Sequence, residues 1–124
     1  AHHVGSEEIS QQWTRISNDL IFRICKLFAD NFAPVGQLPQ FRGAPPKNSI
    51  PELERIVGEL GFVGVNLNPD PSGGYWTDPP LTDRQWYPLY EKLCELDVPA
   101  MIHVSSSCNP NFHHTGAHYI NGDT

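Results

Sequence analysis

The chain has 124 residues, of which 39% are hydrophobic, and its 8 basic and 14 acidic residues give a formal net charge of −6. This length supports one modest hydrophobic core, and the negative charge, with basic residues that do not cluster, argues against a nucleic-acid partner. No apolar run approaches the roughly 18 to 20 residues that span a bilayer, so the sequence predicts neither membrane insertion nor secretion.

The first predicted element is a helix of about 22 residues that begins near Ser6. Its apolar residues follow one another at steps of three and four, which is the spacing of one stripe along a helix. Glu7 and Glu8 lie in the first turn, where the helix dipole favours anions. The stripe consists of Ile9, Trp13, Ile16, Leu20, Ile24 and Leu27.

A short apolar run over residues 32–37 predicts the first strand, although Pro34 and Gly36 weaken it. Ser49 and Glu52 have the S-x-x-E spacing of a capping box, which predicts the start of a second helix. The apolar residues that follow predict the buried face of this helix. They are Leu53, Ile56, Val57 and Leu60.

The second strand is predicted over residues 62–67, because a short and nearly continuous apolar run is typical of a parallel strand covered on both faces. A turn-forming loop follows at residues 68–74. Thr82 and Gln85 repeat the capping spacing before a third helix, and residues 100–104 predict the third strand. The apolar stripe of the third helix consists of Trp86, Leu89, Tyr90, Leu93 and Leu96.

The alternation of helix and strand, without a hairpin signal, predicts an α/β fold with a parallel sheet and helices outside it. Such an order fits an open doubly wound sheet or one arc of a closed (β/α)₈ TIM barrel. No G-x-G-x-x-G follows any strand, so the barrel is favoured over a dinucleotide-binding fold. A barrel needs eight such units and typically about 250 residues. Residues 1–124 are therefore predicted to be a fragment of a single barrel domain.

Reactive residues of parallel α/β folds gather at the carboxyl ends of the strands and in the loops that follow. Here these places are residues 37–42, 66–75 and 103–123. His103 stands out because it interrupts an apolar strand at its exit end. A histidine in this position is either hydrogen-bonded inside the core or a ligand for zinc or manganese, and the sequence leaves both roles open.

Four motifs follow one another along the chain, at residues 61–76, 99–104, 109–113 and 116–121. In this order they resemble the 4-oxalomesaconate hydratase family. This family lies in the branch of the amidohydrolase superfamily that includes aminocarboxymuconate-semialdehyde decarboxylase. The resemblance implies a barrel to which this chain contributes about strands 3 to 5 with their helices.

The resemblance implies a lyase that adds water to 4-oxalomesaconate, a small carboxylate-rich substrate, in the degradation of protocatechuate or gallate. It also implies one divalent metal, expected to be Zn²⁺, for which His103 matches a ligand at the end of the fifth strand. Tyr119 and Asn121 match an H-Y-x-N segment and are assigned to substrate contact. Arg42 is the local candidate for pairing with a substrate carboxylate. The remaining metal ligands and the catalytic acid and base are expected outside this chain.

Two alternatives stay open. A decarboxylase or hydrolase of the same superfamily would use the same metal-binding histidine, and an inactive barrel fragment or interaction module would use the fold only for packing. Three widely spaced cysteines without a C-x-x-C pair indicate reduced thiols, which fits a cytoplasmic enzyme. A homo-oligomer of the full-length enzyme is compatible with the sequence.

Overall fold

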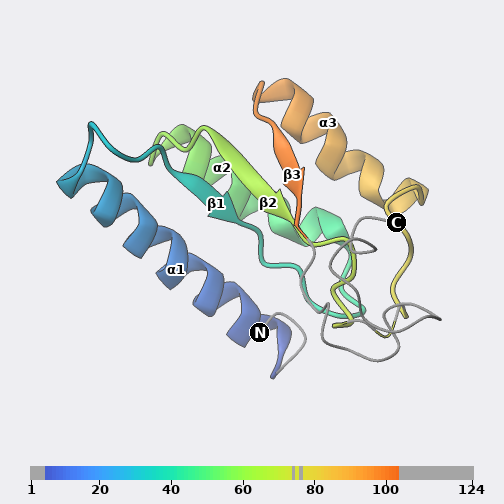
Figure 1. Ribbon diagram of the computed structural model, residues 1–124. Helices are drawn as coiled ribbons and strands as arrows, with labels where there is room; N and C mark the ends of the chain where they lie inside the picture. The colour runs from blue at the N-terminus through green and yellow to red at the C-terminus, as the bar shows by residue number, and fades with distance from the viewer. Residues whose placement is uncertain (1–4, 74, 76, 104–124) are drawn as a thin grey trace, which may run out of the picture.

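The computed structural model describes residues 5–73, 75 and 77–103, in which helices and strands alternate as predicted (Figure 1). Short 3-10 turns at Pro46–Ser49 and Arg84–Trp86 lead into the second and third helices. The helices and strands are α1 (Glu7–Leu27), β1 (Val35–Gln37), α2 (Ile50–Gly58), β2 (Gly64–Leu67), α3 (Tyr87–Glu95) and β3 (Ala100–Ile102).

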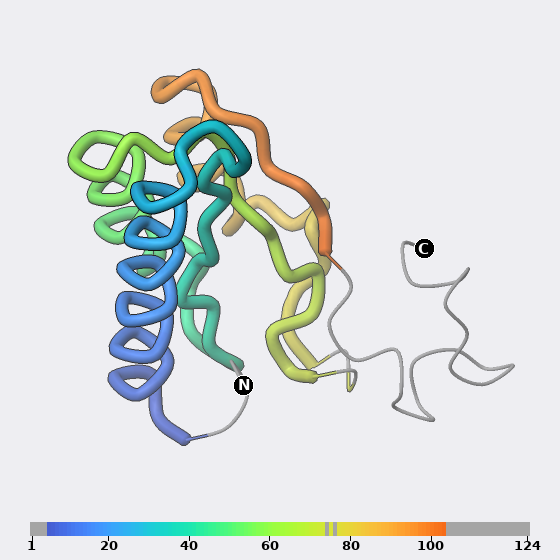
Figure 2. The backbone as a smooth tube through the Cα atoms, turned by 60° about the vertical axis from the view of Figure 1, so that its left-hand side comes forward, coloured from blue at the N-terminus to red at the C-terminus, as the bar shows by residue number. Residues whose placement is uncertain are grey.

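The three strands form one sheet in the order β1-β2-β3, and both neighbouring pairs are parallel. In the register of the sheet, Gln37 lies beside Asn66, and Asn66 lies beside Met101. Figure 2 shows the strands side by side, with α1 next to β1 at one margin of the sheet. Because the strands are parallel, their carboxyl ends lie at one edge. The predicted parallel α/β arrangement is confirmed.

One hydrophobic core joins α2 and α3 to a single face of the sheet. Gly36 belongs to this face, because a Cβ atom at this position would collide with Cδ1 of Ile56. Each large side chain buried here contributes about 1.5 to 3 kcal/mol relative to an exposed one. The predicted stripes of α2 and α3 are confirmed by this packing. The core consists of Leu38, Leu53, Ile56, Phe62, Val65, Leu67, Trp86, Leu89 and Leu93.

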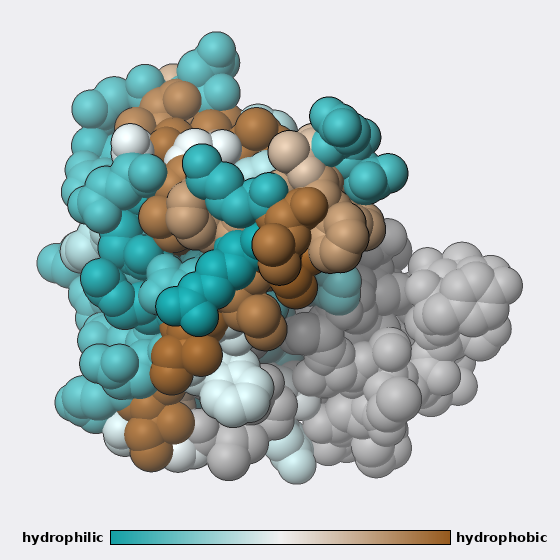
Figure 3. All heavy atoms as spheres, turned by 90° about the vertical axis from the view of Figure 1, so that its left-hand side faces the viewer, coloured by the Kyte–Doolittle hydropathy of each residue, from teal (hydrophilic) through white to brown (hydrophobic). Residues whose placement is uncertain are grey.

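Helix α1 has the predicted extent, and Ser6 caps it by accepting a hydrogen bond from the N–H of Ile9 at 3.4 Å. Its buried residues, however, are polar: Ser10, Thr14 and Asn18. The predicted apolar stripe is exposed, from 40% at Ile24 to 76% at Leu27. Figure 3 looks onto this side of the molecule and shows apolar side chains gathered on it. No helix within the described ranges is both long and apolar enough to cross a membrane.

Two helix starts differ from the predicted capping pattern. Ser49 has helical backbone angles and makes no capping hydrogen bond with its side chain, so the predicted capping box is wrong. The carboxylate of Glu52 instead binds Arg55. Asp83, one residue later than predicted, caps the turn before α3 by accepting from the N–H of Gln85 at 2.9 Å.

The first two strands begin later than predicted, because the preceding helices continue as turns. The N–H groups of Asn31 and Phe32 both donate to the carbonyl oxygen of Phe28, at 2.9 and 3.2 Å. The N–H of Phe62 likewise donates back into α2, to the oxygen of Ile56 at 2.9 Å. Backbone groups committed to these turns do not join the strand ladder.

We expect the isolated 124-residue chain to be marginally stable and to self-associate, because the stripe on α1 is exposed and, among the described residues, Met101 and His103 are exposed on the sheet. Replacing both Ile16 and Leu20 with serine should reduce association and dye binding while helix content persists. Sedimentation velocity, a hydrophobic dye and circular dichroism measure these outcomes. As a control, Leu53→Ser in the core should unfold the chain. Cooperative unfolding of a monomeric, unmodified chain would contradict the expectation.

Candidate active face at the strand ends

His103 directly follows β3, and its backbone continues the sheet. Its N–H donates to the carbonyl oxygen of Leu67 at 2.8 Å, which adds one hydrogen bond to the ladder between β2 and β3. Ile102 pairs with Leu67, which belongs to the core on the helix side of the sheet. Strand side chains alternate between faces, so Met101 and His103 lie on the opposite face. The imidazole of His103 is exposed there.

The face opposite α2 and α3, called here the helix-free face, carries a row of side chains from all three strands. Gln37, Asn66 and Met101 are register partners and therefore share this face, with His103 two residues beyond Met101. The Oδ1 atom of Asn66 is buried and has no hydrogen-bond partner within the described part of the chain. The carboxyl end of the helix-free face thus combines two amides with an imidazole.

The metal site implied by the family resemblance is only partly represented here. Among residues 5–73, 75 and 77–103, no three His, Cys, Asp or Glu side chains lie together as a metal ion would require. His103 fits the role of one ligand, because its exposed imidazole follows a strand exit and is a ligand type suited to zinc or manganese. Tyr119 and Asn121 lie outside the described residues, so their contact with substrate stays a prediction.

Arg42 lies exposed in the loop after β1 and lines an open hollow together with residues of the loop after β2. In the part of the chain that is described, Arg42 forms no ion pair, so its guanidinium is available to an anion. The two loops are joined where the N–H of Gly43 donates to Oδ1 of Asp78 at 2.6 Å. His103 is not among the residues that line this hollow, so the structure does not bring the two candidates into one pocket.

Gln40, which no sequence motif singles out, joins the same two loops deeper in the fold. Its side chain is buried, and its amide binds the backbone of Asn68 twice. Nε2 donates to the oxygen of Asn68, and Oε1 accepts from the N–H of Asn68, both at 2.8 Å. The one signal in the sequence was a polar residue between the apolar Leu38 and Phe41 just after a strand.

The loop after β2 is held by a chain of hydrogen bonds from polar side chains to the backbone. Oδ1 of Asn68 accepts from the N–H of Asp70 at 3.0 Å, and Oδ1 of Asp70 accepts from the N–H of Ser72 at 3.0 Å. The hydroxyl of Ser72 donates to Asp70 and accepts from the N–H of Thr77 at 3.3 Å. These are the residue types that favour turns, and the predicted loop is confirmed.

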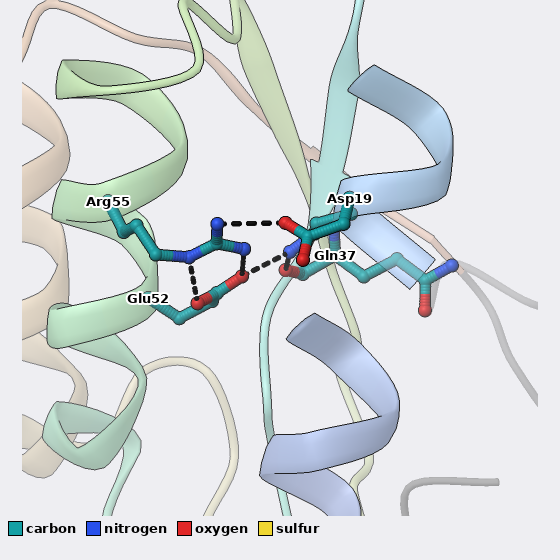
Figure 4. Close-up of polar contacts among 5 residues, drawn as sticks. Asp19, Gln37, Glu52 and Arg55 are labelled. Carbon is teal, nitrogen blue, oxygen red and sulfur yellow. Dashed lines mark hydrogen bonds and ion pairs between the residues drawn. The ribbon is translucent and has the colours of Figure 1, made fainter. Parts of the chain in front are cut away.

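A polar network fixes the end of β1 to α1 and α2 (Figure 4). Oδ1 of Asn18 accepts from the N–H of Gln37 at 2.9 Å, and its Nδ2 donates to the oxygen of Gln37 at 3.0 Å and to Glu52 at 2.9 Å. Arg55 binds Glu52 at 2.7 Å and Asp19 at 2.8 Å. The hydrogen bonds that Arg55 donates to the Glu52 carboxylate hold the pKa of Arg55 above its ordinary value.

We expect Asn18→Leu to lower the free energy of unfolding of the full-length protein by about 2 to 3 kcal/mol, because it leaves the backbone N–H and oxygen of Gln37 without the Asn18 amide and removes one hydrogen bond from Glu52. Chemical denaturation measures the change. Gln12→Leu, at an exposed position of the same helix, is the matched control and should change stability by less than about 0.5 kcal/mol. Equal stability of the two variants would show that the network is dispensable.

Comparison with known proteins places these observations in a family context. A family model described as Amidohydrolase matches residues 2–123. A 2-keto-4-carboxy-3-hexenedioate hydratase from Sphingobium sp. strain SYK-6 is 58% identical over 124 residues, which is 100% of this chain and 36% of that relative. The chain therefore spans little more than a third of the length of this curated relative.

Two solved structures resemble the fold. The crystal structure of 4-oxalomesaconate hydratase from Rhodopseudomonas palustris is 57% identical, with a TM-score of 0.80 over 85% of this chain and 32% of that chain. A 5-carboxyvanillate decarboxylase from Novosphingobium aromaticivorans, solved with bound manganese, is 24% identical, with a TM-score of 0.70 over 89% of this chain and 29% of that chain. At this lower identity the likeness concerns the fold alone.

Proposed function

This chain belongs to the amidohydrolase family, and from that premise we propose that the longer protein containing it is a hydratase that adds water to the double bond of 4-oxalomesaconate. The observation that carries this proposal is the 58% identity to a hydratase along the whole chain. The aligned region includes the loops after the strands, where parallel α/β folds keep their chemistry. In this proposal the reaction takes place in the cytoplasm. The proposal is also compatible with a homo-oligomer of the full-length protein.

The fold of the longer protein is a (β/α)₈ barrel, and residues 1–124 form about its third to fifth units within one domain. Three observations support this proposal. The strands are parallel, α2 and α3 pack against one face of the sheet, and the opposite face carries the row of side chains that ends at His103. In a closed barrel that face becomes the interior, and its carboxyl end becomes the mouth.

His103 contributes one imidazole to a divalent metal at this mouth. Zinc is the expected ion, and manganese is the alternative that one structural neighbour contains. A divalent metal supplies a Lewis acid that polarises a substrate oxygen. The chain's own contribution is to hold the imidazole at a strand exit, where a neutral histidine is a natural ligand.

Substrate recognition is assigned to Arg42, Tyr119 and Asn121. A substrate rich in carboxylates needs cationic and hydrogen-bonding partners, and the fork of a guanidinium matches the geometry of a carboxylate. The exposed position of Arg42 in the hollow between two loops supports its part in this assignment.

The full-length protein should hydrate 4-oxalomesaconate, and it should not release carbon dioxide from aminocarboxymuconate semialdehyde. Loss of the conjugated absorbance of the substrate follows hydration, and a coupled assay follows carbon dioxide. If the protein decarboxylates the semialdehyde and does not hydrate 4-oxalomesaconate, the proposal is wrong and the protein is a decarboxylase of the same superfamily. Absence of both reactions in a metal-loaded, folded protein would favour a non-catalytic role.

We expect His103→Ala in the full-length protein to remove most of the bound metal and to lower kcat by about 100-fold or more. Even the loss of a residue that only hydrogen-bonds a metal ligand lowers metal affinity or activity by about 10- to 100-fold. The fold should persist, since the side chain is exposed on the sheet. Metal analysis and circular dichroism on one preparation measure both effects. Met101→Leu, on the same face and of similar volume, is the control. Full metal retention in His103→Ala would refute the ligand assignment.

A further inference from the structure

The peptide group between Leu67 and Asn68 is hydrogen-bonded on both sides. Its carbonyl oxygen, from Leu67, accepts from the N–H of His103 at 2.8 Å. Its N–H, from Asn68, donates to Oε1 of Gln40 at 2.8 Å. A peptide group is planar and nearly rigid, so these two hydrogen bonds act on one body. If the contact with Gln40 is lost and the peptide group tilts, the carbonyl oxygen of Leu67, which accepts from the N–H of His103, is displaced as well.

Gln40 supplies these contacts where strand β1 no longer does. β1 ends at Gln37, and the backbone N–H of Gln40 turns to the oxygen of Leu38 at 2.8 Å. The side-chain amide has the same donor and acceptor as a peptide group. It binds both the N–H and the oxygen of Asn68, which are the two bonds that a neighbouring parallel strand gives to one residue. The ladder across the sheet is thus extended by a side chain.

The surroundings of Gln40 make this contact rigid. The side chains of Gln40 and Asn68 are both buried, at 4% and 7% exposure. Buried hydrogen bonds of this kind are strengthened by the low local dielectric and are costly to leave unmade. The small pocket beside Gln40 is lined by Pro71 and by Trp86, which belongs to the core.

We propose that Gln40 is a positioning residue for His103. Its amide extends the sheet to Asn68, one residue beyond β2, and thereby sets the backbone from which the imidazole of His103 projects. This inference rests on the proposed role of His103 as a metal ligand. A glutamate would keep only the acceptor for Asn68, and an asparagine is one methylene too short, so the position requires the glutamine side chain.

The test compares Gln40→Met with wild type in the full-length protein, because methionine has a similar length but lacks the amide. The backbone amide of His103 should exchange its hydrogen at least about ten-fold faster, and zinc affinity measured by chelator competition should fall by about ten-fold. The kcat/KM value should fall in parallel. Gln11→Met, at an exposed position on α1, is the matched control and should leave all three unchanged.

A second control separates positioning from general loss of stability. Leu93→Ala weakens the core between α3 and the sheet without touching either loop, so it should retain wild-type zinc affinity at an equal folded fraction. The inference is overturned if the His103 amide exchanges at the wild-type rate in Gln40→Met, or if Leu93→Ala loses zinc to the same extent. If Gln40→Met does not fold, Gln40→Asn takes its place, because its shorter amide gives up the contacts with Asn68, and the same effects are expected.

Failure of the proposed function gives a different result. If His103→Ala keeps its zinc, or if the protein does not hydrate 4-oxalomesaconate, the metal role or the reaction is wrong. The exchange rate of the His103 amide in Gln40→Met still decides whether Gln40 holds this backbone, because that readout needs neither metal nor substrate.

Discussion

The packing of α2 and α3 against one side of β2 is the constraint on which the rest of the structure depends. Val65 and Leu67 fill the space between these helices and the sheet, and burial of the two residues fixes which face every other strand residue occupies. A shift of one residue in this register would turn His103 toward the helices. The face that the candidate ligand occupies therefore follows from the register between its strand and Leu67, which is buried in the core.

Amide side chains take the place of strands where the sheet ends. Asn18 binds the backbone of Gln37 beside β1, and Gln40 binds the backbone of Asn68 beyond it. Both amides satisfy backbone groups that would be costly to bury without partners. They also connect the helices and loops to the strand ends, so that the active face is held by the same bonds that complete the sheet.

In this fold catalytic groups gather in the loops after the strands, and residues of the two described loops differ in their surroundings. The loop after β2 is braced by its own polar residues and by Gln40, whereas Arg42 is exposed at the rim of a hollow. A braced loop suits the positioning of a metal ligand on the adjoining strand. An exposed arginine suits the capture of an anionic substrate from solvent.

The sequence by itself determined the order of elements, the parallel α/β class and the buried stripes of α2 and α3, because periodicity and turn residues are local properties. It also placed His103 at a strand exit. Only the tertiary structure decided that α1 turns Asn18 and not its apolar stripe toward β1, that Ser49 does not cap α2, and that Gln40 binds Asn68. These features depend on contacts between residues far apart in the sequence, and spacing along the chain carries no information about which distant backbone group a buried amide will meet.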